Sequence, residues 1–267
     1  MPRRLTPARL ALMLFVALAM LWLMIPVLIV APMSFSSARF LAFPPPGWSL
    51  RWYDSYLADP SWMRATRVSL TVAVSSALIA TLIGTAAAYA LNMASRRLAG
   101  VLQVLLLLPL VVPIVITAVG VFLVFANVGL LSSIPGLILA NVMLGMPYVV
   151  TSVLVGLRKF DPVQEMVARS LGMNRLRAFF SVTLPQIRPS VVSGTLFAFI
   201  SALDETVVAI FISGGENQTL TKKMFTALRD EIDPTIAALS TLLTATSFLL
   251  LALMALNLRA RARKGAR

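Results

Sequence analysis

The feature that most constrains this chain is residues 98–157, a run of 60 residues without a charged side chain. A helix crosses the roughly 30 Å hydrocarbon core of a membrane with about 20 apolar residues, so the run is too long for one crossing. Turn-forming residues interrupt it, first Asn127 and Gly129, then Pro135 and Gly136. We therefore predict two membrane helices here, at about 101–126 and 135–157.

Four further apolar stretches have the length of a membrane span: residues 10–33, 68–94, 189–213 and 234–258. Composition agrees, because 59% of the residues are hydrophobic and 12% are charged, against about 45–50% and about 25% in soluble domains. The first stretch exceeds the roughly 7–15 apolar residues of a secretory signal, so we expect it to stay as the first span. The predicted fold class is all-α: a polytopic membrane protein with six transmembrane helices in a single domain, residues 1–267.

The distribution of basic residues predicts that both termini are cytoplasmic. With the N-terminus inside, 16 of the 23 lysines and arginines fall in inner segments, as expected from the excess of basic residues in cytoplasmic loops. Topology and lipid head groups therefore explain the net charge of +13 better than nucleic-acid binding does. The longest inner segment, residues 158–188, lies between the fourth and fifth spans.

This inner loop is predicted to fold into two short helices. Asp161 followed by Pro162 is a typical helix start, and Gly172 can adopt the left-handed conformation that ends a helix. The second helix is expected to pass through Phe179 and to end before Leu184. Apolar residues throughout the loop indicate that it binds a partner protein; the alternative is that it folds back on its own helix ends.

Asp204 and Glu205 are the acids inside the fifth predicted span. Asp204 lies 15 residues after Pro189, or about 22 Å along a helix, which places it in the outer half of the membrane. A charge in a span costs about 2.5–3.5 kcal/mol, so both acids should face the bundle or water. Because neighbouring side chains diverge, we expect one to line a pathway for a cationic amine, and the other to pair with an arginine or cap a helix break. A purely structural ion pair is the alternative.

No enzymatic chemistry is indicated by the sequence. Cysteine and histidine are absent, which removes common metal ligands and the commonest general base. The chain also lacks the glycine-rich loop, ending in lysine and serine or threonine, that holds ATP phosphates. We therefore predict no catalytic residue and no metal site, and we expect any ATPase to be another chain.

The inner loop resembles the cytoplasmic coupling loop of binding-protein-dependent ABC importer permeases. The stretch from Glu165 to Met173, with Leu184 following Gly172 at the family's spacing, carries the resemblance. Met166 and Val167 depart from the family's pattern, which has a glutamate and an alanine at these positions. The resemblance implies a role in coupling to the ATPase for Glu165, Ala168, Gly172, Phe179, Phe180, Leu184 and Pro185.

A second resemblance, to spermidine/putrescine permeases, is carried by the residues from Asp204 to Gly214 and by residues 228–238. It implies a multi-pass permease subunit in the bacterial inner membrane that forms half of the pathway for a small cationic solute, such as putrescine or spermidine, with Asp204 and Glu205 on that pathway. The implied partners are two ATP-binding subunits that hold ATP and Mg²⁺, a second and different permease, and a periplasmic solute-binding protein. This chain itself would hold no cofactor and would contact the lipid bilayer but no nucleic acid.

Three alternatives remain at this point. The solute could instead be an amino acid, an opine, an aminoalkylphosphonate or a ferric ion. An ATP-independent channel or carrier is a different class, disfavoured by the long inner loop and by the scarcity of acids within the spans. A membrane enzyme is disfavoured by the missing catalytic residue types.

Overall fold

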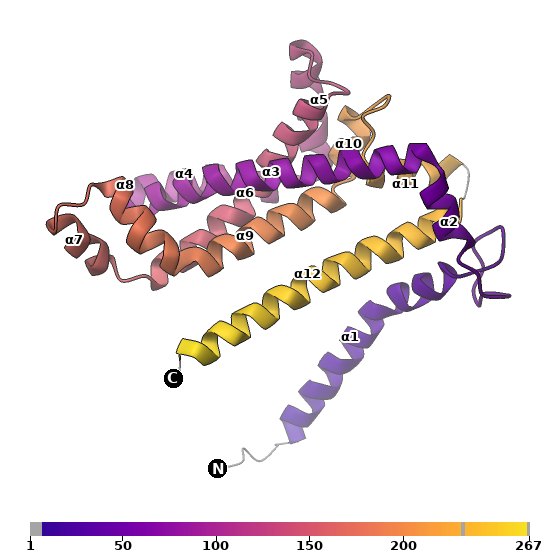
Figure 1. Cartoon of the computed structure of the whole chain (residues 1–267), viewed down its shortest axis with the longest axis horizontal. Helices are drawn as coiled ribbons and strands as arrows, with labels where there is room; N and C mark the ends of the chain where they lie inside the picture. The colour runs from indigo at the N-terminus through magenta and orange to yellow at the C-terminus, as the bar shows by residue number, and fades with distance from the viewer. Residues whose placement is uncertain (1–6, 231–232, 266–267) are drawn as a thin grey trace. The chain divides into compact units, whose positions relative to one another are not determined.

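The computed structural model describes residues 7–230 and 233–265, and these residues are helical apart from loops and one isolated bridge between Ser36 and Trp48 (Figure 1). The all-α fold class is thereby confirmed. The chain divides into two compact units. The first contains the described residues up to Pro60 and those within 226–248, and the second contains residues 61–225 and the described residues 249–265.

The first unit holds α1 (Pro7–Met33), α2 (Arg51–Ala58) and the beginning of α12 (Thr235–Gly265). Helix α1 is apolar on all sides and its side chains are mostly exposed, as expected of a span that lipid surrounds. After α1, the hydroxyls of Ser34 and Tyr53 lie 2.8 Å apart and fix the loop to α2. The spans predicted at 10–33 and 234–258 therefore correspond to α1 and α12.

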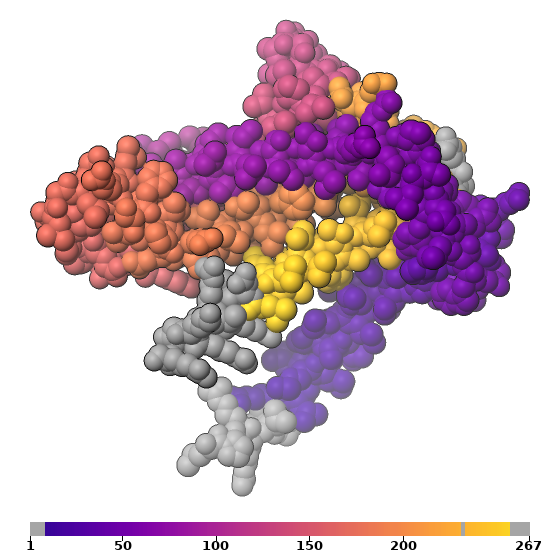
Figure 2. Space-filling view, in the orientation of Figure 1, coloured from indigo at the N-terminus to yellow at the C-terminus, as the bar shows by residue number. Residues whose placement is uncertain are grey.

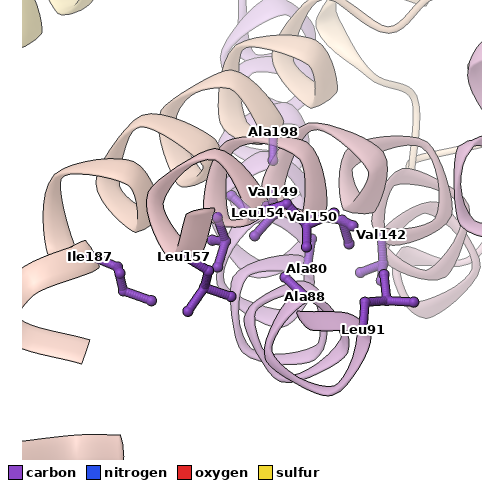
Figure 3. Packing of buried hydrophobic residues seen from close by; sticks show 12 residues of the cluster. Ala80, Ala88, Leu91, Val142, Val149, Val150, Leu154, Leu157, Ile187 and Ala198 are labelled. Atoms are coloured by element: carbon purple, nitrogen blue, oxygen red, sulfur yellow. The ribbon is translucent and has the colours of Figure 1, made fainter. Parts of the chain in front are cut away.

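The second unit is built on three long helices that lie side by side: α3 (Pro60–Met93), α6 (Ile134–Lys159) and α9 (Leu184–Asp204) (Figure 1). Small residues allow their backbones to approach closely. A Cβ atom at Gly194 would lie 2.9 Å from Cα of Val149, and one at Gly84 would lie 2.9 Å from Cβ of Val149. Figure 3 shows the apolar cluster between them, whose labelled members are Ala80, Ala88, Leu91, Val142, Val149, Val150, Leu154, Leu157, Ile187 and Ala198.

The prediction of one helix at 101–126 is wrong. The chain forms α4 (Arg96–Val111) and α5 (Ile114–Val128), which are bent by 100° relative to each other. Val112 is extended, with φ −70° and ψ 133°, because a residue before proline avoids the helical region. Pro113 then starts the new direction, and α5 packs against α10 (Val207–Ile212).

The inner loop contains α7 (Pro162–Ser170), α8 (Arg175–Ala178) and the π-helix η1 (Phe179–Thr183). Asp161 caps α7 by accepting a hydrogen bond from the Val163 N–H at 3.0 Å. Gly172 follows with φ +93°. The predicted start of α7 and the predicted left-handed glycine are both confirmed.

The predicted end of the second loop helix before Leu184 is wrong. Thr183 and Leu184 are both helical, so η1 continues directly into α9. Helix α9, which corresponds to the fifth predicted span, therefore begins at Leu184. Pro189, the predicted first residue of that span, lies inside the helix. A wider π-turn before Pro185 accommodates a residue that has no N–H to donate and whose ring would crowd a regular α-turn.

The predicted span 189–213 is also interrupted. Helix α9 ends at Asp204, and α10 begins at Val207 after a non-helical Glu205. Helix α11 (Leu220–Asp230) follows. By length and apolar composition, four of the described helices can cross a membrane, α1, α3, α6 and α12, or five if α4 and α5 together form one span. Helix α9 is not among them.

Candidate functional site

Glu205 caps the helix that follows the break between α9 and α10. Its Oε1 accepts a hydrogen bond from the Val208 N–H at 2.7 Å, and its Oε2 accepts one from the Ala209 N–H at 2.9 Å. Free N–H groups and a partial positive charge at a helix start favour a carboxylate there. Of the two roles expected for the acidic pair, the structure therefore places Glu205 as the cap.

Asp204 borders a cavity of about 600 Å³ in the second unit. Its carboxylate forms no hydrogen bond or ion pair that involves any of the described residues 7–230 and 233–265. The two helix breaks meet at this cavity, since its lining includes residues from both sides of each break. The lining residues are Pro109, Leu110, Ile114, Leu144, Tyr148, Phe197, Ile200, Ser201, Asp204, Glu205, Thr206 and Val207.

The lining has the chemistry of a cation site. It contains two carboxylates and no basic side chain. The Glu205 carboxylate is already committed to two backbone N–H groups, which leaves Asp204 as the available anion. The rings of Tyr148 and Phe197 also border the cavity, and aromatic faces attract cations.

Hydrogen bonds connect the cavity to the N-terminal part of α3. The Thr221 hydroxyl donates to the Glu205 carbonyl at 2.8 Å. The Leu220 N–H donates to the Ser69 hydroxyl at 2.7 Å, where both residues are buried. Next to them, the Lys222 ammonium donates to the Ser213 carbonyl, and burial lowers the pKa of this lysine. Helix α11 is thereby attached both to the break and to α3.

In the inner loop, α7 is held against the bundle by a buried carboxylate. Glu165 is 5% exposed. Its Oε1 accepts a hydrogen bond from the Tyr89 hydroxyl at 2.5 Å, and its Oε2 accepts one from the Thr183 hydroxyl at 2.5 Å. Ala168, one turn later, is the other buried residue of α7. Glu165 and Ala168 thus form the inner face of this helix.

Phe179 and Phe180 of the loop point to different surroundings. The Phe179 ring lies 4.6 Å from the Tyr89 ring between centroids and packs against the apolar cluster. Phe180 is 61% exposed. Of the remaining residues singled out in the loop, Gly172 and Pro185 are exposed, and Leu184 packs partly against the apolar cluster.

Tyr89 is a site residue that sequence reasoning did not identify. It contacts Glu165, Phe179 and Arg175, whose guanidinium carbon lies 5.6 Å from the centroid of the tyrosine ring. A tyrosine near the end of a span is common, because amphipathic rings favour the membrane interface. Only its position near the cytoplasmic end of the second predicted span could have drawn attention to it.

The outward side of the loop is an exposed apolar surface, which we call the docking face. It consists of Val163, Val167, Leu171, Leu176 and Phe180, each at least 50% exposed. The first three are spaced four residues apart, so those within α7 share one side of the helix. Helices α7 and α8 form one end of the second unit, as the red and orange atoms in Figure 2 show.

The described residues thus form an all-helical bundle with several candidate membrane spans and a helical loop that presents an apolar face, and the comparisons identify the class as a transport permease. Residues 80–264 match the family described as "Binding-protein-dependent transport system inner membrane component". The chain belongs to this family. It is a permease subunit of an ABC importer in the inner membrane, and the ATPase and the periplasmic binding protein of such a system are separate subunits.

Similarity to individual relatives supports the membership of this chain in the family. The chain is 36% identical over 225 residues to the putrescine transport system permease protein PotI of Escherichia coli (strain K12), which covers 82% of this chain and 80% of the relative. It is 30% identical over 239 residues to the spermidine/putrescine transport system permease protein PotC of Haemophilus influenzae (strain ATCC 51907 / DSM 11121 / KW20 / Rd), covering 89% and 92% of the two chains.

Solved structures show the same fold. A chain of a bacterial ABC transporter involved in import of the acidic polysaccharide alginate matches with a TM-score of 0.70 at 16% identity, covering 95% of both chains. A chain of an amino acid ABC transporter matches with a TM-score of 0.55 at 18% identity, covering 80% of this chain and 98% of the other. At these identities the likeness concerns the fold alone.

Proposed function

We propose that this permease forms half of a translocation pathway for a small cationic solute, of the putrescine and spermidine class. The observation that carries the proposal is the Asp204 carboxylate, which borders a cavity of about 600 Å³ with no basic side chain in its lining. An unpaired acid within a membrane bundle is costly unless it meets water or a cation. The names of PotI and PotC, both polyamine permeases, support the same solute class.

The cavity provides one free carboxylate, because Glu205 is occupied as a helix cap. A diamine carries two ammonium groups, so its second charge needs an acceptor outside this cavity. This requirement favours a second permease that contributes the other half of the pathway, and the similarity to the polyamine permeases PotI and PotC is our reason to propose a different chain for it. A neutral or acidic solute would gain nothing from Asp204.

We further propose that α9 and α10 make the sixth crossing and that both termini are cytoplasmic. Helix α9 has 21 residues, which at 1.5 Å per residue is about 30 Å, the thickness of the hydrocarbon core. Gln186, Arg188 and Asp204 make it less apolar than the other spans. Polar residues in a span are tolerated where they face the bundle or a water-filled path.

Coupling to ATP hydrolysis is assigned to the inner loop. The docking face would bind the ATPase, with Phe180 as its aromatic anchor, and two ATPase copies would serve the two permeases. Glu165, Ala168 and Phe179 hold the loop from the inside. Gly172, Leu184 and Pro185 shape its turns and its junction with α9.

The test is ATP hydrolysis and uptake by the reconstituted complex of this chain with its ATPase, second permease and binding protein. We expect putrescine-loaded binding protein to stimulate hydrolysis. Asp204→Asn should lower putrescine uptake about tenfold, as expected for one lost charge-assisted contact. Asp54→Asn, which neutralises an exposed acid outside the cavity, is the matched control and should leave uptake unchanged.

Other outcomes are equally informative. Stimulation by an amino acid or a ferric ion, with none by putrescine or spermidine, would keep the importer and overturn the polyamine assignment. Equal uptake by Asp204→Asn and Asp54→Asn would remove Asp204 from the pathway.

A further inference from the structure

We infer that Tyr89 is a positioning residue that passes movement of α7 to α3, and through α3 to the edge of the Asp204 cavity. The inference rests on the proposed docking of the ATPase at α7, but it does not depend on which solute is carried. It begins with the number of elements that one side chain joins. Tyr89 belongs to α3, and its hydroxyl and ring reach α7, α8 and η1 through Glu165, Arg175 and Phe179.

The connection to α7 is strong because the acceptor is a buried carboxylate. A carboxylate withdrawn from water must keep its donors, and removal of one leaves a costly unsatisfied group. Glu165 has two donors, Tyr89 from α3 and Thr183 from η1. Among the described residues, the other side-chain hydrogen bond from α7 to a neighbouring helix joins the exposed amides of Gln164 and Gln186, and an exposed contact contributes less.

Helix α3 is suited to transmit a displacement along its axis. It is unbroken over 34 residues, a length of about 50 Å. Close packing at Gly84 holds it against Val149 of α6. Packed helices of this kind move as bodies and do not deform continuously.

The far end of α3 is attached to the cavity edge. Ser69 accepts the buried hydrogen bond from Leu220. The next residue, Thr221, donates to the carbonyl of Glu205, at the break between α9 and α10. Closer to the start of α3, the ring of Trp62 contacts α11 as well: the Lys223 ammonium of α11 lies 4.5 Å from the ring centroid. A shift of α3 therefore displaces the segment that holds the break beside Asp204.

The test uses the full reconstituted complex with Tyr89→Phe, which removes the hydroxyl and keeps the ring against Phe179. We expect normal assembly with the ATPase and basal hydrolysis within about twofold of wild type. The ratio of solute transported to ATP hydrolysed should fall about tenfold, the effect of one lost hydrogen bond to a charged group. Thr183→Val removes the other donor and should act in the same direction.

Two variants separate positioning from general structural damage. Glu165→Gln keeps an acceptor for the Tyr89 hydroxyl, and its amide can donate to the Thr183 hydroxyl, so most of the coupling should be retained. Gln186→Ala removes the exposed amide contact and should leave coupling at the wild-type ratio. If Tyr89→Phe couples normally, or if it fails to assemble with the ATPase, the inference is overturned.

A second readout is independent of the solute. The chain has no cysteine, so spin labels attached to Asn92→Cys on α3 and Ser170→Cys on α7 report on these two helices when the partner subunits are cysteine-free variants. We expect one narrow distance distribution with and without ATP, and a broad one in Tyr89→Phe. An unchanged narrow distribution in Tyr89→Phe would overturn the inference. Failure of putrescine to stimulate the wild-type complex would affect the proposed solute and leave this result standing.

Discussion

At the scale of single residues, two adjacent acids have different roles because the backbone turns between them. Asp204 is the last residue of α9, whereas Glu205 is extended, with φ −66° and ψ 117°, and reaches forward to the N–H groups of α10. The sequence indicated that the pair would divide its roles, since neighbouring side chains point apart. It could not indicate which acid caps, because that depends on where the helix breaks.

The cap makes a prediction about stability. Glu205→Ala leaves the Val208 and Ala209 N–H groups without their acceptor. We expect it to lower the free energy of unfolding by about 1–2 kcal/mol, the usual cost of a lost helix cap, measured as a lower melting temperature of the purified protein. Glu216→Ala is the control: this exposed acid pairs with Arg64 at the surface, and such pairs contribute little. Equal effects of the two variants would contradict the role of Glu205.

At the scale of helices, apolar length and helix-start signals were predictable from the sequence, and helix breaks were not. Asp161 and Gly172 delimit α7 because their preferences are local. Prolines were ambiguous: Pro109, Pro147 and Pro189 lie inside helices, whereas Pro113 starts a new one. Neighbouring helices decide whether a freed carbonyl finds a partner, and a single sequence does not contain that information.

The close approach of α6 and α9 gives a second prediction. A methyl group at Gly194 would lie 2.9 Å from the Val149 Cα, and a backbone atom cannot move aside as a flexible side chain can. Gly194→Ala should therefore destabilise the protein by about 1–3 kcal/mol, as overpacking does. Gly120→Ala, with no atom within 4 Å of the added methyl group, is the matched control. Thermal unfolding in detergent compares the two, and equal melting temperatures would exclude a tight contact at Gly194.

At the scale of the whole molecule, membership of the permease family leaves the number of crossings to be measured. Length and composition select four helices, or five with the bent pair α4 and α5. The sixth crossing depends on α9, whose polar residues Arg188 and Asp204 reduce its apolar character. Asp204 follows from the proposed place of α9 beside the pathway, so a residue that makes the span harder to recognise is the one that transport requires.

Side-specific labelling decides whether α9 and α10 cross the membrane. Because the chain has no cysteine, a single introduced cysteine reports one position. Leu171→Cys lies before α9, and Leu171 is 81% exposed; Glu216→Cys lies after α10, where the native side chain is also 81% exposed. No other long helix lies between these positions, so their relative sidedness depends on α9 and α10 alone. With both termini inside, an impermeant maleimide added to spheroplasts that express this chain without the ATPase, which would cover Leu171, should label Glu216→Cys at once and Leu171→Cys only after permeabilisation. If both are labelled only after permeabilisation, the segment returns to the side from which it entered. Asp204 would then lie at the tip of a re-entrant loop, and α9 and α10 would not form the sixth membrane crossing beside the proposed pathway.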